Sequence, residues 1–393
     1  MAKHTIDTNT SQPVIVSGSG GTWVVTKTAS VITAQAFHET ALSDAKGARD
    51  NTIIVNGAVL GGAAGDDDGI VISGRNSNVV IGKSGNVQGD AGVHMSGQHA
   101  SVENHGALTA SWAGIFADHG GRFVNDGSID AGVGIWSNAG AATIINGTGG
   151  TITSGDTAII LQGNGATSRI INHGTIDAYY YAVDGSTGAD IITNRGIMKG
   201  AISLKEGNDV FDNRGGTVDQ DISSNGGNDT QITDDANVKL SEADGGGRDT
   251  VRSTVSYTLN ANVENLVLIG KAIGATGNEL NNRLEGNNAS FNNIQGGAGK
   301  DHLQGHGGGD VLSGGADADV FIFSTGDDDD AIVDFEKGLD HIGLRGWDAI
   351  SNFADVKSHA SDIGTDITIH AGKDSIRIQG VDMTDLHAAD FLF

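Results

Sequence analysis

The sequence of 393 residues contains no cysteine and only one proline, Pro13. Without cysteine no disulfide can stabilise the fold, so an exported protein of this composition would need another cross-link, and bound metal is the obvious one. A single proline beside 62 glycines excludes a collagen-like triple helix, which needs both residues in a strict triplet. Aromatic residues make up only 5% of the chain, which favours a core of thin Val, Ile and Leu layers.

Positive charge and long apolar runs are also scarce. The chain has 23 basic and 49 acidic residues, a net charge of −26, which argues against a nucleic-acid partner because the phosphate backbone attracts a basic surface. No apolar run reaches about 18 residues, so we expect no membrane insertion. The first residues also lack the apolar segment of a signal peptide. Residues 296–393 alone hold 19 acidic and 6 basic residues.

Glycine-punctuated repeats fill the first half of the chain. In six segments apolar residues lead to an asparagine, a glycine and further apolar residues; these asparagines are Asn104, Asn125, Asn146, Asn172, Asn194 and Asn213. Repeats of about 20–25 residues bury an apolar face only by stacking on one another, which predicts a parallel β-helix. We expect each asparagine at a coil corner, because asparagine tolerates left-handed conformations and can bond its own backbone or the asparagine of the next coil.

A second recurrence lies between the asparagines, in the segments AGVHM, AGIFA, VGIWS, TAIIL and YAVDG. Because side chains alternate along a strand, the central apolar residue of each should point inward and its successor outward. The outward residues are His94, Phe116, Trp136, Ile160 and Asp184, of which Phe116, Trp136 and Ile160 form an apolar stripe. We call the first four of these residues the contact row. Exposed apolar rows usually mark contact surfaces. The partner could be another copy of the chain, its own N-terminal segment, or a glycan.

Three nonapeptides follow one another at residues 296–322: GGAGKDHLQ, GHGGGDVLS and GGADADVFI. They fit G-G-x-G-x-D-x-U-x, where U is apolar, except for His306 and Asp317. Glycine allows tight turns with free carbonyls, and aspartate adds a hard anionic oxygen, so the pattern suits calcium. This stretch resembles the RTX family of calcium-binding repeats. The resemblance implies a β-roll with calcium between its turns, bound by Asp301, Asp310 and Asp319 and by the carbonyls of Gly296, Gly305 and Gly314; Asp317 could join them.

Weaker units precede the nonapeptides. Counting back in nines places Asn292 and, after one inserted residue, Asn282 in the aspartate position, which predicts metal-free turns held by amide hydrogen bonds. Isolated units further upstream offer Asp209, Asp229 and Asp249, which are candidate calcium ligands or simply turn-stabilising aspartates.

The end of the chain, from VFIFSTGDDDD to HAADFLF, resembles the C-terminal cap and export signal of RTX proteins secreted by type I systems. The resemblance implies a Gram-negative source and an extracellular location. The acidic run at residues 327–330 could bind cations, but we expect it to be a solvated turn. The predicted fold is all-β, in five parts: an N-terminal strand or cap segment, a parallel β-helix, connecting coils, a calcium-binding parallel β-roll and a C-terminal β cap, at residues 1–45, 46–235, 236–295, 296–325 and 326–393.

Two classes of function remain open. Residues 50–220 resemble autotransporter passengers and adhesins, which predicts a non-enzymatic, calcium-stabilised structural or adhesive protein of the cell surface or extracellular matrix, self-associating as a homo-oligomer or filament. A β-helix before RTX turns also resembles polysaccharide lyases and alginate epimerases, so the alternative is a glycan-active enzyme or a carbohydrate-binding rod for extracellular polysaccharide. The epimerase motif Asp-Pro-His-Glu is absent. An acid–base site could use His173, Tyr179, Tyr180, Tyr181 and Asp184, although tyrosines beside a turn more often pack.

Overall fold

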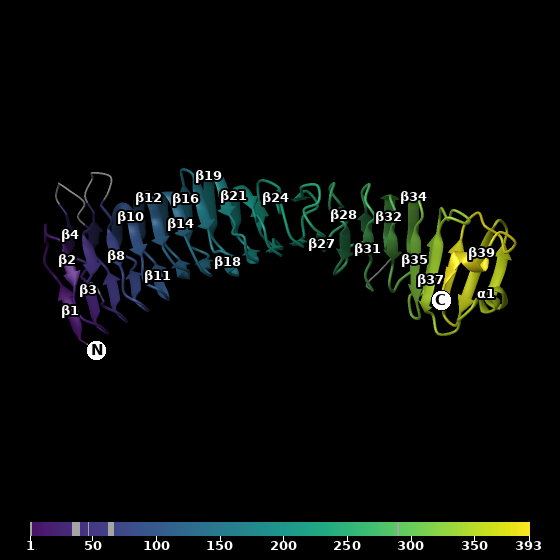
Figure 1. Ribbon diagram of the computed structural model, residues 1–393, viewed down its shortest axis with the longest axis horizontal. Coiled ribbons are helices and arrows are strands. Elements are labelled where there is room, and N and C mark those ends of the chain that lie inside the picture. Colours follow the sequence, from purple (N-terminus) through teal and green to yellow (C-terminus); the bar gives the residue numbers. More distant parts are fainter. Residues whose placement is uncertain (1, 34–39, 46, 62–66, 289–290) are drawn as a thin grey trace. The chain divides into compact units, whose positions relative to one another are not determined.

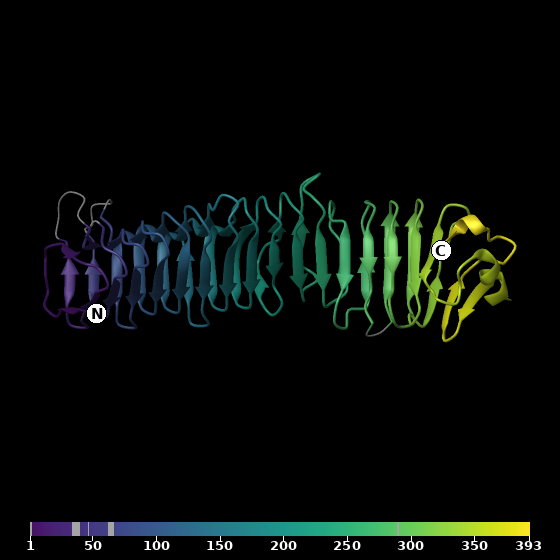
Figure 2. The same ribbon diagram turned by 60° about the horizontal axis from the view of Figure 1, so that its bottom comes forward.

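The structure is a computed structural model that describes residues 2–33, 40–45, 47–61, 67–288 and 291–393. It is all-β, with about 3% helix, and its described strands form the coils of a parallel β-solenoid, the fold class that the sequence predicts. The chain divides into two compact units, unit 1 at Met1–Asn225 and unit 2 at Gly226–Phe393. Figures 1 and 2 show the strands of each unit stacked in successive coils.

Unit 1 is built from two stacks of parallel strands, one on each side of its coils. The first stack contains β1 (Lys3–Ile6), β3 (Thr22–Val25), β6 (Thr52–Val55), β9 (Asn78–Ile81), β11 (Ala100–Asn104), β13 (Gly121–Asn125), β15 (Thr143–Asn146), β18 (Ser168–Asn172), β20 (Asp190–Asn194) and β22 (Val210–Asp212). The second contains β2 (Val14–Val16), β4 (Ser30–Ile32), β5 (Leu42–Asp44), β7 (Ala58–Leu60), β8 (Ile70–Ile72), β10 (Asn86–Met95), β12 (Ala107–Ala117), β14 (Ser128–Ser137), β16 (Thr151–Ser154), β17 (Thr157–Leu161), β19 (Thr175–Asp184), β21 (Ile197–Ser203), β23 (Thr217–Val218) and β24 (Ile222–Ser223).

The core of unit 1 consists of thin aliphatic layers between the two stacks. The central residues of the second recurrence are aligned from coil to coil and fully buried, as the alternation predicts: Val93, Ile115, Ile135, Ile159 and Val183. Burying one such side chain stabilises a fold by about 1.5–3 kcal/mol. Each layer is too thin to be stable alone, so every coil depends on its neighbours.

The six repeated asparagines form an uninterrupted ladder of buried amides. The Nδ2 atom of each donates to the Oδ1 atom of the next, from Asn104 to Asn213, at 2.7–2.9 Å. None of the six has a positive φ, so the left-handed conformation is not used. The expected bonds between coils are present, and so are bonds to the local backbone, since the Gly106 N–H donates to Asn104 Oδ1 at 3.1 Å. A buried amide is costly unless it is hydrogen-bonded, and the coil above provides the partner at every step.

Unit 2 continues the same principle with shorter coils. Its first stack contains β25 (Thr230–Thr233), β27 (Thr250–Ser253), β29 (Asn265–Leu268), β31 (Arg283–Glu285), β33 (His302–Gln304), β35 (Val320–Ser324), β37 (His341–Gly346) and β41 (Phe391–Leu392). Its second contains β26 (Leu240–Ser241), β28 (Tyr257–Thr258), β30 (Gly274–Thr276), β32 (Asn293–Ala298), β34 (Val311–Ala316), β36 (Asp329–Ile332) and β40 (Asp374–Ile378). Leu303, Leu312 and Phe321, the apolar positions of the nonapeptides, are fully buried between the stacks.

A mixed sheet forms the C-terminal part of unit 2. Strand β40 pairs in parallel with β36 and antiparallel with β39 (Asp366–Ala371), which in turn pairs antiparallel with β38 (Ala360–Ile363). Before this hairpin lies helix α1 (Phe353–His359), capped by the side chain of Asn352, and after it comes the 3-10 helix η1 (Ala388–Asp390). The change from parallel to antiparallel pairing ends the repeating coils.

Candidate metal centre

One acidic or amide side chain per coil precedes each strand of the first stack in unit 2 from β25 to β37. We call these residues row 1: Asp229, Asp249, Glu264, Asn282, Asp301, Asp319 and Asp340. Backbone N–H groups link them: Asn282 donates to Asp301 Oδ1 at 2.7 Å, Asp301 to Asp319 Oδ1 at 2.8 Å, and Asp319 to Asp340 Oδ1 at 2.9 Å. One carboxylate oxygen of each aspartate therefore holds the preceding coil.

A second, shorter row lies at the start of three strands of the second stack: two of its residues precede β32 and β34, and the third is the second residue of β36. Row 2 is Asn292, Asp310 and Asp330, and its N–H groups donate to the next Oδ1 atom at 2.6 and 2.9 Å. Successive nonapeptides therefore contribute to opposite sides of the roll, and each aspartate is linked to the one two nonapeptides away. The calcium-binding turns that stack on one another come from alternate repeats.

The remaining carboxylate oxygens of the nonapeptide aspartates are buried and have no hydrogen-bond partner. This holds for the Oδ2 atoms of Asp301, Asp310 and Asp319, whose residues are at most 1% exposed. A Cβ atom at Gly305 would overlap the Asp310 carboxylate, and one at Gly296 would lie against both Asp301 Oδ2 and the Gly314 carbonyl. A carboxylate oxygen thus lies beside each of these glycines, and a carbonyl oxygen also lies beside Gly296. Calcium prefers such oxygen donors, so these residues fit a calcium ion.

Burial and mutual repulsion raise the pKa of these carboxyls. Burial, followed by the nearby Asp319 and Asp317 charges, raises the pKa of Asp301 to about 7. Burial raises the pKa of Asp330 to about 8, and Asp310 adds to the shift. The pKa values of Asp310 and Asp319 rise to about 6, again mainly through burial. Without a cation, these positions are unfavourable for several negative charges at once.

The nonapeptide residues that the sequence predicts as calcium ligands lie in or beside these two rows, except for Asp317. Asp301, Asp319, Gly296 and Gly314 surround row 1, and Asp310 and Gly305 belong to row 2. Asp317 is exposed, has a left-handed φ of 79°, and accepts a hydrogen bond from the Gly299 N–H at 3.3 Å. That all these residues bind calcium stays a prediction.

Asn282 and Asn292 occupy the aspartate positions that the sequence assigns to them. Their Oδ1 atoms accept from the N–H groups of their own turns, at 2.7 and 2.8 Å. Their Nδ2 atoms donate to backbone carbonyls of Val263 and Ala272 at 3.1 and 3.0 Å. The amide therefore supplies the donor that a carboxylate lacks, and these turns are satisfied without metal.

Sequence analysis missed Asp330 and Asp340, which extend the two rows. The expectation that residues 327–330 form a solvated turn is wrong for Asp327 and Asp330, which are 7% and 5% exposed, because the chain continues there as another coil. A signal was present: both Asp330 and Asp340 follow a glycine-containing turn and precede an isoleucine by two residues, as the D-x-U part of the nonapeptide requires.

The isolated upstream aspartates fall in different surroundings. In unit 1, Asp209 Oδ1 accepts from the Asp190 N–H at 2.6 Å, and the carboxylate of Asp190 accepts from the N–H and hydroxyl of Ser186. In unit 2, Asp229 and Asp249 both lie in row 1, and the Asp229 N–H donates to Asp249 Oδ1 at 2.7 Å.

The contact row of unit 1 has the predicted register but is only half-exposed. His94, Phe116, Trp136 and Ile160 are aligned in successive coils. Trp112, which sequence analysis missed, lies in an irregular segment of β12 and packs on Phe116 and Trp136 with ring centroids 4.8 and 5.5 Å apart. The register change at this segment breaks strand alternation, so periodicity could not reveal the orientation of this ring.

The candidate acid–base residues are divided between the two stacks. His173 follows β18 in the first stack, whereas Tyr179, Tyr180 and Tyr181 lie in β19 of the second and are exposed. Asp184 forms an ion pair of 2.8 Å with Lys205. The four residues of β19 lie on one strand, but His173 belongs to another part of the coil.

Comparison with known proteins identifies the repeats of unit 2. The family described as RTX calcium-binding nonapeptide repeat (4 copies) matches residues 287–321 and 295–332. The chain therefore carries calcium-binding RTX repeats, and calcium is their ligand. One similar solved structure is the extracellular lipase LipA from Serratia marcescens, at 17% identity over 58% of this chain, with a TM-score of 0.22; the match spans 40% of that chain. No curated protein matches. No helix among the described residues is long and apolar enough to cross a membrane.

We expect the stability of the calcium-free protein to fall with rising pH, and the strength of calcium binding to rise. The raised pKa values mean that folded, calcium-free unit 2 binds more protons than the unfolded chain, whose aspartates titrate near pH 3.9, so its stability falls as pH rises from about 4 to about 7. Calcium competes with these protons, so its binding strengthens over the same window. Urea unfolding at about pH 5 and about pH 8 measures both slopes. Equal stability of the calcium-free protein at the two pH values would contradict the assignment.

Proposed function

We propose that this chain is a secreted structural or adhesive protein of the cell surface or extracellular matrix, whose unit 2 folds on calcium outside the cell. The observation that supports this proposal most directly is the set of buried, unpaired carboxylate oxygens in the RTX repeats. RTX repeats are typical of proteins exported by type I secretion. Free calcium is low in the cytosol, so the mutually repelling aspartates keep unit 2 loose until it meets calcium outside.

An aromatic surface on unit 1 supports the structural and adhesive part of the proposal. The indole of Trp112 is 38% exposed and covers the contact row, and the rings of Phe116 and Trp136 lie 5.5 Å apart beneath it. Farther along the same stack Tyr179, Tyr180 and Tyr181 are 73%, 57% and 42% exposed. Clustered exposed aromatic side chains are typical of contact surfaces, because each ring buries a large area at small entropic cost.

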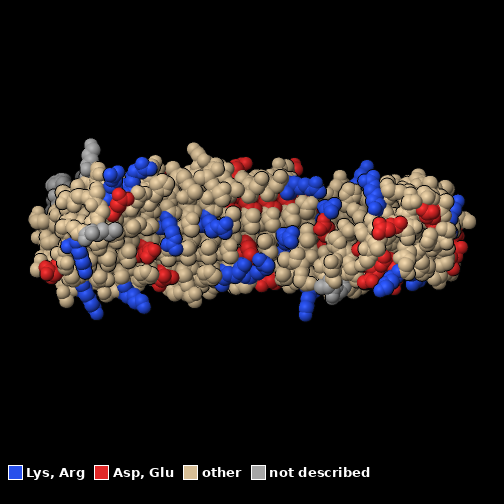
Figure 3. All heavy atoms as spheres, turned by 90° about the horizontal axis from the view of Figure 1, so that it is seen from below, with Lys and Arg blue, Asp and Glu red and all other residues tan. Residues whose placement is uncertain are grey.

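The charge on one face of the protein gives no sign of an anionic partner there. On the face shown in Figure 3, Lys and Arg side chains are dispersed among uncharged residues and interleaved with acidic ones, with no continuous basic patch among the described residues drawn there. A second copy of the chain offers both the aromatic surface and the same mixed charge. We therefore propose a homo-oligomer or filament as the working form.

A carbohydrate-binding role is the second candidate, favoured by Tyr179 and Tyr180. Their rings meet edge to face with centroids 4.7 Å apart and remain largely exposed. Such rings offer an apolar face and a hydroxyl together, which suits the face and rim of a sugar. Extracellular polysaccharide is the corresponding partner, and a glycan-active enzyme would additionally need an acid and a base beside these rings.

The test is the mass of the full chain, measured by light scattering first with calcium and then with chelator. Calcium at about 1 mM is well above the Kd of sensor-type calcium sites. We expect large particles with calcium and loss of this association in the double variant Trp112→Ser, Tyr180→Ser. A matched control, Tyr257→Phe, changes a buried aromatic residue of unit 2. A folded monomer in both conditions would contradict self-association, and a polysaccharide-binding screen would then test the second candidate.

A further inference from the structure

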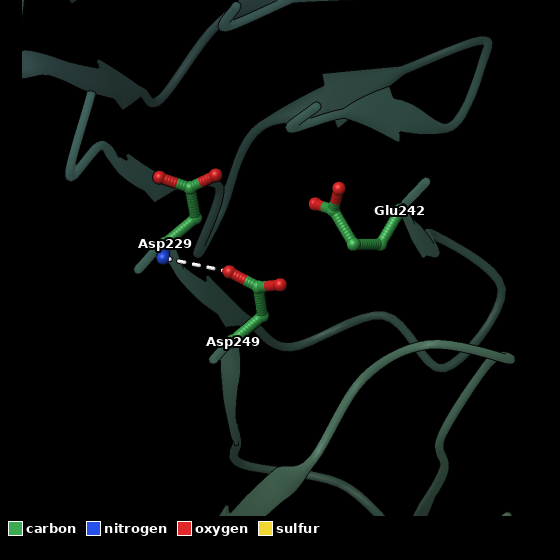
Figure 4. A group of neighbouring side chains, drawn as sticks. All are labelled: Asp229, Glu242 and Asp249. Carbon is green, nitrogen blue, oxygen red and sulfur yellow. Dashed lines mark hydrogen bonds between the residues drawn. The ribbon is translucent and has the colours of Figure 1, made fainter. Parts of the chain in front are cut away.

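A second group of carboxylates lies in unit 2 outside the nonapeptides. Asp229, Glu242 and Asp249 each place one carboxylate oxygen within 4.8 Å of the others (Figure 4). Asp229 and Asp249 are the first residues of row 1, whereas Glu242 comes from the turn that follows β26. Calcium–oxygen distances of 2.3–2.6 Å allow two ligands of one ion to lie up to about 5 Å apart, so the group has the dimensions of a calcium site.

A buried, unpartnered oxygen points into this group. Asp249 is fully buried; its Oδ1 atom accepts the Asp229 N–H at 2.7 Å, and its Oδ2 atom has no hydrogen-bond partner. This is the arrangement of Asp301, Asp310 and Asp319 in the intact repeats, where one oxygen holds the neighbouring coil and the other remains for a cation. An unpaired buried carboxylate oxygen is costly unless an ion occupies the space beside it.

The charged groups around Asp249 are acidic. Burial, together with the charges of Glu242 and Glu264, raises the pKa of Asp249 to about 6. The Asp249 N–H donates to Glu264 Oε2 at 2.8 Å, and the neighbouring Arg248 guanidinium donates to Asn265 at 3.3 Å. Three or four carboxylates converge here, and a divalent cation would balance them.

The backbone turns of this region stack as they do in the intact repeats. Gly247, at φ 151°, lies so close to the Gly227 carbonyl that a side chain would overlap it, just as Gly315, at φ 99°, lies against the Gly297 carbonyl. The difference is one of length: Leu240 precedes Asp249 by nine residues, whereas Ile294 precedes Asp301 by seven. Glu242 thus begins a longer turn, near the position where the intact repeat has Gly296.

We propose that Asp229, Glu242 and Asp249 bind a calcium ion that is separate from the nonapeptide sites. In this site the Glu242 side chain supplies an oxygen from the start of the turn, where the intact repeat offers a glycine carbonyl. The site links β25, β26 and β27, and therefore orders the first coils of unit 2 ahead of the nonapeptides.

The test is calcium titration calorimetry on the full chain and on the variants Glu242→Gln and Asp249→Asn. We expect each variant to bind one calcium ion fewer than the original chain. Asp244→Asn is the matched control, because it removes the same charge from an exposed position in the same turn and should leave the number unchanged. Equal stoichiometry and affinity in all four proteins would overturn the proposal.

A second measurement keeps the test independent of the nonapeptides and of folding defects. In a full-chain background carrying Asp301→Asn, Asp310→Asn and Asp319→Asn, calcium should still slow hydrogen exchange of the peptides covering residues 229–250. Adding Glu242→Gln, a change in a half-exposed turn, should abolish that protection. Protection that persists with Glu242→Gln, or that is absent in the background itself, would overturn the site.

Discussion

Removing calcium is expected to unfold the nonapeptide coils of unit 2 while unit 1 keeps its β-structure. The buried aspartates of rows 1 and 2 would then face one another without a counter-ion, and each lost site forfeits about 2.7 kcal/mol at a calcium concentration one hundred times its Kd. A few such sites equal the whole stability of an ordinary domain, about 5–15 kcal/mol. Unit 1 is held by aliphatic layers and by the neutral asparagine ladder, neither of which needs an ion.

Hydrogen exchange on the full chain, with calcium and then with chelator, measures this difference directly. Peptides from residues 278–346 should exchange much faster after chelation, and peptides from residues 100–213 serve as the internal control. Circular dichroism should show a partial loss of β-structure that calcium restores. An unchanged spectrum and unchanged exchange in chelator would refute calcium-dependent folding of unit 2.

Replacing one nonapeptide aspartate by asparagine is expected to have effects of opposite sign with and without calcium. In Asp319→Asn, the amide Oδ1 can keep the bond from the Asp301 N–H, as Asn282 and Asn292 do with their own turns. With calcium a charged ligand is lost and with it the binding site, which forfeits about 2.7 kcal/mol at a calcium concentration one hundred times its Kd and outweighs the gain described next. Without calcium a buried charge is lost, and because burial raises the pKa of Asp319 to about 6, the variant gains roughly 2 kcal/mol at about pH 8.

Urea unfolding of the variant and the original chain, with and without calcium, measures both stability changes. The control is Asp348→Asn, which removes an equal charge from an exposed position in the same unit and should change stability little in either condition. A loss of stability without calcium as large as that with calcium would mean that Asp319 has only a structural role.

Most of the repeating fold could be predicted because the same residue types recur at nearly regular spacing along the sequence. Stacked coils place equivalent residues above one another. A repeated asparagine such as Asn146, or a repeated isoleucine such as Ile135, therefore lies next to the same residue type in the neighbouring coil. The nonapeptide pattern likewise predicts the positions of Asp301, Asp310 and Asp319. The glycines beside them also follow from it, since only glycine leaves space next to the carboxylate.

The features that were missed depend on how the coil closes. The nonapeptide pattern does not say which repeats stand next to one another, and the structure links Asp301 to Asp319 and Asp310 to Asp330. A nonapeptide makes half a coil, so its neighbour in sequence lies on the opposite side and its neighbour in space is two repeats away. For Asp330 a solvated turn was expected because acidic runs are usually solvated, and only the continuing strands bury Asp330 and Asp340.

The sequence by itself determined the all-β solenoid, the asparagine positions and the calcium-binding chemistry of the nonapeptides, because each depends on a local pattern repeated at fixed spacing. Only the tertiary structure decided which aspartates stand next to one another, that Trp112 covers the contact row, and that Glu242 joins Asp229 and Asp249. These juxtapositions depend on turn length and strand irregularity, which change from coil to coil and leave no periodic trace in the sequence.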